Sequence, residues 1–142
     1  MITFHVFKNI PFQYFEEAKL IQWLNACAQD LNSTIAQLNY QFCNEQTMLD
    51  YNRQYLNHDF HTDILTFPLS HKTNPIAGDI LINIDRMQEN ASQFNQPVDR
   101  ELLRLMAHGL LHLHGYDDQD QSDKIKMTDA EDQCIDLILN SK

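Results

Sequence analysis

The chain has 142 residues, of which 43% are apolar and 21% are charged, and 20 acidic against 10 basic side chains give a formal net charge of −10 at pH 7. A chain of this size and composition can bury roughly two-thirds of its unfolded surface, which excludes a disordered chain. The acidic balance disfavours broad affinity for nucleic acids, and DNA is not an expected partner, because Lys and Arg supply most of that affinity.

Cysteine usage and hydropathy bear on the compartment. The three cysteines, Cys27, Cys43 and Cys134, are widely spaced and form no Cys-x-x-Cys pair, so neither a disulfide framework nor a thiolate zinc site is expected. No apolar run approaches the ~18 to 20 residues of a membrane span, and residues 1–10 lack the features of a signal peptide. We therefore expect one cytoplasmic domain over residues 1–142, with no membrane partner.

The predicted elements of the first half alternate between strand and helix. Runs of β-branched and aromatic residues predict strands, and apolar residues at helical spacing predict helices. The expected elements are a strand over residues 2–7, a helix over 14–31, a strand over 38–42, and a helix that Asn44 caps and that runs to Tyr55.

The second half is predicted to add two strands and three helices. Short apolar runs at 63–67 and 78–84 predict strands joined by a hairpin or a long connection, and a helix follows over 85–94. The next helix starts near Asp99, after Pro97, and ends at Gly115, while Ser122 caps a last helix to about Leu139. This order predicts an α+β fold with a mixed sheet of about four strands, about five helices, and a central helix that bears histidines.

The helix before Gly115 carries the pattern most suggestive of chemistry. His108 and His112 stand four residues apart, which puts both imidazoles on one helix face within reach of a single ion. Such pairs are more often ordinary helix histidines, but this helix is apolar nearly all round, so its polar residues need partners. A residue of the 117–120 turn could fold back as a third ligand and leave a position open for water, as in catalytic zinc sites.

Gly109 lies between the two histidines. Glycine costs ~1 kcal/mol relative to alanine inside a helix, which indicates that a neighbouring element packs closely there. The same residue occupies the place of the glutamate in the His-Glu-x-x-His motif of zinc proteases. Peptide hydrolysis is therefore disfavoured.

In this segment the chain resembles a known family, the YbeY endoribonucleases, which act in ribosomal RNA maturation and ribosome quality control in bacteria. The resemblance extends upstream to residues 52–55, 62–68 and 78–80 and downstream to Met127 and Glu131, and it rests mainly on the string His108-Gly-x-Leu111-His112-Leu-x-Gly115-Tyr116-Asp117. It implies a hydrolase that cuts single-stranded RNA with one zinc ion held by three histidines. His108 and His112 match two of these ligands.

The third ligand departs from the family pattern. Where the family has a histidine directly after Gly-Tyr-Asp, this chain has Asp118. A carboxylate can replace an imidazole at zinc at a similar distance. The resemblance therefore implies one Zn²⁺ held by His108, His112 and Asp118, with His114, Asp117 and Asp120 as competitors for the third place.

Arg53 and Asp117 are the candidates for catalytic roles. Many family members carry an arginine that serves the RNA where this chain has Leu56, and Arg53 lies one helical turn earlier; the alternative is a solvated surface arginine. Water bound to the metal would attack the phosphodiester, and Asp117 could accept its proton. A turn residue or a helix cap is an equal alternative for Asp117.

The resemblance implies three partners: single-stranded RNA, ribosomal RNA and the small ribosomal subunit. Helical spacing places Arg104 near the histidine face, with a salt bridge to Glu101 as the alternative. Aromatic residues such as Phe60 or Tyr116 could stack on unpaired bases. Two other functions stay open: a ribosome-assembly or RNA-binding factor with weak or no catalysis, and a metal hydrolase for a small phosphoester.

Overall fold

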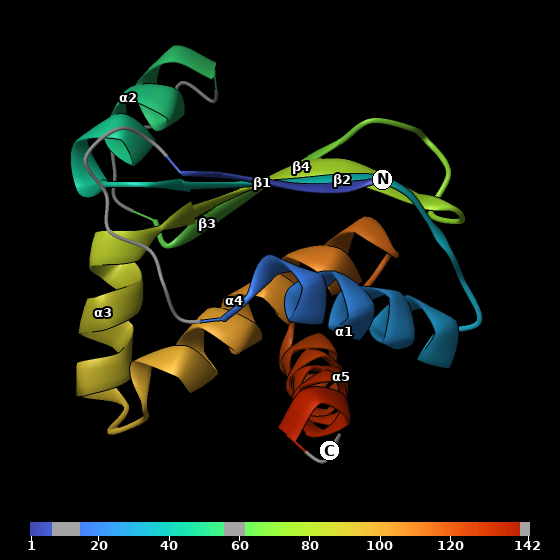
Figure 1. Cartoon of the computed structure of the whole chain (residues 1–142). Coiled ribbons are helices and arrows are strands. Elements are labelled where there is room, and N and C mark those ends of the chain that lie inside the picture. Colours follow the sequence, from blue (N-terminus) through green and yellow to red (C-terminus); the bar gives the residue numbers. More distant parts are fainter. Residues whose placement is uncertain (7–14, 56–61, 140–142) are drawn as a thin grey trace.

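The computed structural model describes residues 1–6, 15–55 and 62–139. In chain order the elements are β1 (Ile2–Val6), α1 (Glu17–Asp30), β2 (Ile35–Cys43), α2 (Glu45–Tyr55), β3 (Ile64–Pro68), β4 (Ile76–Asn83), α3 (Ile84–Gln93), α4 (Val98–Leu113) and α5 (Gln121–Leu139). Figure 1 shows the sheet seen nearly edge-on, with the helices around it. No helix in the described ranges is long and apolar enough to cross a membrane.

The four strands form one mixed sheet in the order β1-β2-β4-β3. β2 pairs in parallel with both β1 and β4, and Tyr40 lies at the centre of this ladder opposite Ile80. β3 pairs antiparallel with β4, so of the two connections considered, a hairpin or a long connection, the strands form the hairpin. The α+β prediction, with a mixed sheet of four strands, is therefore confirmed.

The helices divide between the two faces of the sheet. Figure 1 shows α1, α4 and α5 on one side of the sheet and α2 on the other. The side chains of β4 alternate accordingly: Ile80 and Ile82 join the main core with α4, whereas Leu81 packs with Met48 of α2. This alternation is what a period of two residues imposes on a strand that is covered on both faces. It makes α4 the central, buried helix that carries the histidines.

Gly109 lets α4 lie directly on the sheet. A Cβ added at this position would lie 2.7 Å from Cδ1 and 2.9 Å from Cγ2 of Ile80, too close for a real contact. The close packing predicted from this helical glycine is therefore confirmed, and β4 is the element that approaches. This contact sets how closely α4 packs against the sheet next to His108.

The ends of the helices follow from local hydrogen bonds. As predicted, the Asn44 side-chain oxygen accepts from the Thr47 N–H at 2.9 Å, and Gly115 follows α4 with a φ of +109°. The prediction that Ser122 caps α5 is wrong, because the Asp120 carboxylate accepts from the Asp123 N–H at 2.8 Å. A carboxylate placed there also complements the positive end of the helix dipole.

Candidate metal centre

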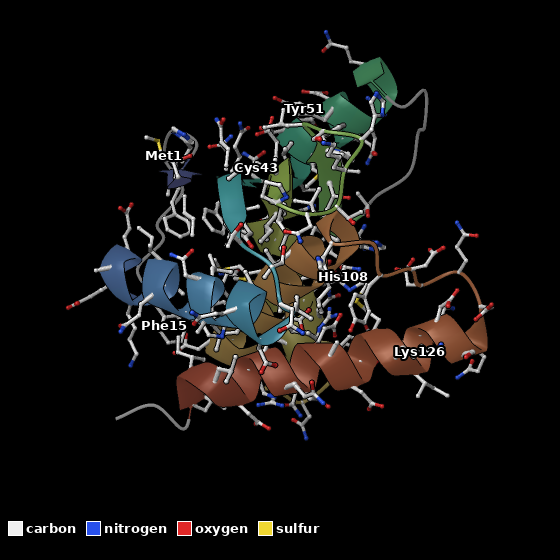
Figure 2. The ribbon with its side chains drawn as sticks, turned by 90° about the vertical axis from the view of Figure 1, so that its right-hand side faces the viewer. Met1, Phe15, Cys43, Tyr51, His108 and Lys126 are labelled. Atoms are coloured by element: carbon white, nitrogen blue, oxygen red, sulfur yellow. The ribbon has the colours of Figure 1, made fainter. Side chains whose placement is uncertain are left out.

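His108 and His112 both use Nδ1 for a hydrogen bond within the protein. His108 Nδ1–H donates to Glu131 Oε2 at 2.5 Å, and His112 Nδ1–H donates to the carbonyl of Tyr116 at 3.0 Å. Such partners fix the ring orientation and the tautomer of histidine ligands. Both Nε2 atoms are left as lone-pair donors. Figure 2 shows His108 on α4, with α5 running below it.

Asp118 faces these two nitrogen atoms. Its Oδ2 atom lies 3.5 Å from His108 Nε2 and 3.4 Å from His112 Nε2. Tetrahedral coordination with ligand bonds of ~2.0 to 2.1 Å requires ligand atoms roughly 3.3 to 3.4 Å apart, so these spacings suit a zinc-sized ion. The donor set of two imidazoles and a carboxylate is also one that zinc and other divalent metals accept. His108, His112 and Asp118 could therefore hold a metal ion together.

The turn after α4 brings Asp118 back to the helix. The positive φ of Gly115 reverses the chain, and the Tyr116 N–H donates to the carbonyl of Leu111 at 2.9 Å. One residue later, the Asp117 carboxylate accepts from the Asp118 N–H at 2.8 Å. The turn, held by these local hydrogen bonds, therefore brings Asp118 to the two histidines.

The three candidate ligands lie in a cavity of about 330 Å³ between α4 and β3. The segment that resembled the family upstream forms the facing wall, and α4 supplies a cation next to the histidines. The lining residues are Thr62, Asp63, Ile64, Thr66, Arg104, Leu105, His108, His112 and Asp118. The cavity is large enough to hold a phosphate-sized group beside the candidate ligands.

Arg104 is held among carboxylates one helical turn before His108. Its Nε and Nη2 atoms donate to the two oxygens of Glu101 at 2.7 and 2.6 Å, and its nitrogens lie 3.7 Å from Glu131 and 3.9 Å from Asp63. Burial alone would lower the pKa of this guanidinium, but the hydrogen bond and charge of Glu101, and then the charges of Glu131 and Asp63, raise the pKa above its ordinary value. Arg104 therefore stays cationic.

Glu131 is the important residue that the sequence reasoning did not assign a role. It lies on α5 and is 4% exposed, among apolar residues that recur at helical spacing (Met127, Ala130, Cys134, Ile135 and Ile138). A carboxylate on an apolar stripe must find a partner or lose stability. A carboxylate on an apolar helix face was the sequence signal that could have identified Glu131. The structure shows that its partners are His108 and Arg104.

The Glu131→Gln substitution should lower zinc affinity roughly 10- to 100-fold, the usual effect of losing a hydrogen-bond partner of a histidine ligand. The physical reason is that a neutral amide accepts the His108 Nδ1–H less strongly than a carboxylate does. Competition with a fluorescent zinc chelator measures this affinity.

The matched control is Asp129→Asn, which removes one negative charge from an exposed position of the same helix. We expect this variant to bind zinc as the unaltered chain does. An equal loss of affinity in the two variants would show that only the charge of α5 matters. Unaltered affinity of Glu131→Gln would show that Glu131 does not orient His108.

The other predicted site residues lie elsewhere. Arg53 is exposed in the last turn of α2, and Figure 2 shows Tyr51 of the same helix far from His108. Asp117 and His114 line a different hollow, on the other side of the turn, where His114 Nδ1–H donates to the carbonyl of Thr73 at 3.3 Å. Among the described residues that line the metal cavity, Arg53 and Asp117 do not occur, so their catalytic roles stay predictions.

Of the competitors for the third ligand position, Asp120 caps α5, and His114 and Asp117 face the separate hollow. Asp118, the predicted third ligand, is the residue that lies near both histidines. Leu56 and Phe60 lie outside the described residues.

Comparisons with known proteins point to one family. The family model described as Endoribonuclease YbeY matches residues 7–138. The chain is 41% identical over 136 residues to the Endoribonuclease YbeY of Cytophaga hutchinsonii, covering 95% of each chain, and 39% identical over 137 residues to that of Flavobacterium psychrophilum, covering 96% of each. A solution structure from Thermotoga maritima superposes with a TM-score of 0.69 at 25% identity, over 99% of this chain and 90% of that one.

Proposed function

The chain belongs to the YbeY family of endoribonucleases, and we propose that it is a single-strand-specific, zinc-dependent endoribonuclease whose ion is held by His108, His112 and Asp118. The observation that carries the proposal is the approach of Asp118 Oδ2 to within 3.4 and 3.5 Å of the two Nε2 atoms. The family supports the RNA endonuclease activity, and the donor set supports the metal.

Hydrolysis of RNA forms a bond from a water oxygen to phosphorus and breaks the bond to one ribose oxygen. A bound zinc ion supplies Lewis acidity for this reaction. His108 and His112 present Nε2 because Glu131 and Tyr116 hold their Nδ1 atoms. Arg104 lines the same cavity and remains cationic, but it is bound to Glu101, so its charge offsets the carboxylates around it.

We place this activity in ribosomal RNA maturation and ribosome quality control in the cytoplasm, on the strength of the family resemblance. The net charge of −10 disfavours long-range attraction to RNA, so the chain depends on a local site. Binding should therefore be weak and salt-sensitive unless the ribosomal subunit presents the substrate.

Metal removal tests the proposal directly. Purified protein should contain about one zinc per chain by mass spectrometry and should cleave an unstructured RNA oligonucleotide but not the same sequence in a duplex or as DNA. Dialysis against a chelator should abolish cleavage, and added zinc should restore it.

Undiminished cleavage by metal-free protein would refute the proposal. RNA binding without cleavage at any metal concentration would instead favour the alternative of an RNA-binding factor. Measuring binding and cleavage on the same labelled oligonucleotide separates these outcomes.

A further inference from the structure

A second, larger cavity adjoins the metal cavity. Its volume is about 1170 Å³, against about 330 Å³ for the cavity that holds the candidate ligands. Asp63 and Arg104 line both cavities and so form the boundary between them. An endonuclease cuts inside a strand, so nucleotides must extend beyond the small cavity, and the larger cavity begins where the small one ends.

Phe94 lines this larger cavity with an exposed aromatic ring. Of the phenylalanines that the structure describes, it is the most exposed, at 57%. It follows the last residue of α3, where its N–H donates to the carbonyl of Asn90 at 2.9 Å and the Gln96 N–H donates to the carbonyl of Ala91 at 2.9 Å. The backbone on both sides of the ring is therefore fixed, and the ring costs little entropy to use as a contact surface.

The walls suit a neutral planar group better than a phosphate. The cavity is lined by four carboxylates and only two guanidinium groups, namely Asp63, Asp99, Glu131, Asp132, Arg100 and Arg104. Arg100 lies 3.6 Å from Asp132 and Arg104 binds Glu101, so both cations are engaged. This excess of negative charge repels phosphate. A nucleobase carries no charge and has a face that stacks on aromatic rings.

Polar groups for the edge of a base are present as well. Gln96 lines the cavity with a side-chain amide, which offers both donors and acceptors. The Asn90 amide nitrogen donates to Asp63 and Glu101, so Asn90 offers the cavity its amide oxygen as an acceptor, and Leu103 adds apolar surface. A concave site with apolar walls and a few polar groups is typical of small-molecule and cofactor sites.

We propose that this cavity is a base-binding subsite, in which Phe94 stacks on an unpaired nucleobase of the RNA while the adjoining phosphate lies beyond Arg104 in the metal cavity. The inference rests on the proposed endoribonuclease function and deepens it. It supplies a physical source for single-strand specificity, because a base paired in a duplex cannot enter the cavity.

The test compares Phe94→Ala with Ile125→Ala, a truncation at an apolar side chain that is 54% exposed on α5 and lines neither cavity. Fluorescence anisotropy with a short labelled oligoadenylate, in chelator so that no cleavage occurs, should show about tenfold weaker binding for Phe94→Ala. Ile125→Ala should bind as the unaltered chain does, and Phe94→Tyr, which keeps a ring, should retain most of the affinity.

An abasic substitution in the RNA makes the test specific. Removing one base at the right position should weaken binding to the unaltered chain about tenfold and should have little further effect on Phe94→Ala, since both changes remove the same contact. In cleavage assays of the zinc-loaded protein, Phe94→Ala should raise KM and leave kcat nearly unchanged.

Three outcomes would overturn the inference. Equal binding by Phe94→Ala and Ile125→Ala, or additive effects of the abasic site and Phe94→Ala, would show that no base contacts the ring. A change in oligomeric state of Phe94→Ala by light scattering would assign the surface to a second copy of the chain. If the unaltered chain cleaves RNA and Phe94→Ala has no effect, the subsite is refuted and the proposed nuclease function stands. If binding depends on the base but no RNA is cleaved, the nuclease function is refuted and the subsite stands.

Discussion

His112→Ala is expected to bind no stoichiometric zinc and to cleave RNA roughly a thousandfold or more slowly, a loss of about 4 kcal/mol of transition-state stabilisation. The substitution removes the Nε2 atom that lies 3.4 Å from Asp118 Oδ2. His108 and Asp118 alone are too few protein ligands for a zinc site, which takes three or four. Metal analysis of the purified variant and single-turnover cleavage of an unstructured RNA measure the two effects.

The variant should fold normally, because the His112 side chain is 25% exposed and its described hydrogen bond goes to the carbonyl of Tyr116. His114→Ala is the matched control, since it removes a second imidazole from the end of the same helix, two residues further on. His114 faces the hollow with Asp117, so this variant should keep its zinc and its activity. Loss of zinc in both variants would mean that the helix end, and not the ligand set, had been damaged.

Local patterns were sufficient to predict the elements of the fold but not their order in the sheet. The Asn44 cap, the Gly115 terminus and the close approach at Gly109 depend on neighbours in sequence or on one missing side chain, and all three predictions are confirmed. The order β1-β2-β4-β3 depends on which apolar faces meet across the whole chain. The predicted cap of α5, Ser122, lies two residues beyond the observed cap, Asp120, an error in a helix boundary that periodicity does not resolve.

The candidate site likewise has a part that local sequence predicts and a part that depends on packing between distant segments. The His108 and His112 pair, and a return of the chain after Gly115, follow from helix geometry and a turn, so the sequence allowed them to be predicted. Glu131 reaches His108 from 23 residues away through the packing of α5 against α4, and no local spacing encodes that contact. Its place on an apolar stripe marked it only as a residue in need of a partner.

Glu101 is a second buried carboxylate that needs a partner, and its burial affects the stability of the fold. Glu101 is 3% exposed, and Arg104 forms a two-pronged contact with it at 2.7 and 2.6 Å. Asn90 adds one hydrogen bond to the same carboxylate at 3.2 Å. An ion pair on a protein surface contributes little to stability, but removing one partner of a buried pair leaves a charge with neither water nor a counterion.

The second prediction with a large effect follows from this burial. Arg104→Met should lower the free energy of unfolding by about 3 to 5 kcal/mol, because Glu101 loses its counterion. Arg86→Met is the control, since Arg86 and Arg104 have similar side-chain exposures of 34% and 32%, but Glu45, the partner of Arg86, is 29% exposed against 3% for Glu101. The control should cost about 1 kcal/mol or less. Urea unfolding of the metal-free proteins gives both values.

A double variant separates the lost charge pair from lost packing. If the cost of Arg104→Met comes from an unpaired carboxylate, adding Glu101→Gln should recover most of it, because the amide carries no charge and still accepts from Asn90. If the cost comes from the missing guanidinium contacts alone, the double variant should be no more stable than Arg104→Met. A cost of Arg104→Met no greater than that of Arg86→Met would contradict the buried pair altogether, because Glu101 is much more deeply buried than Glu45.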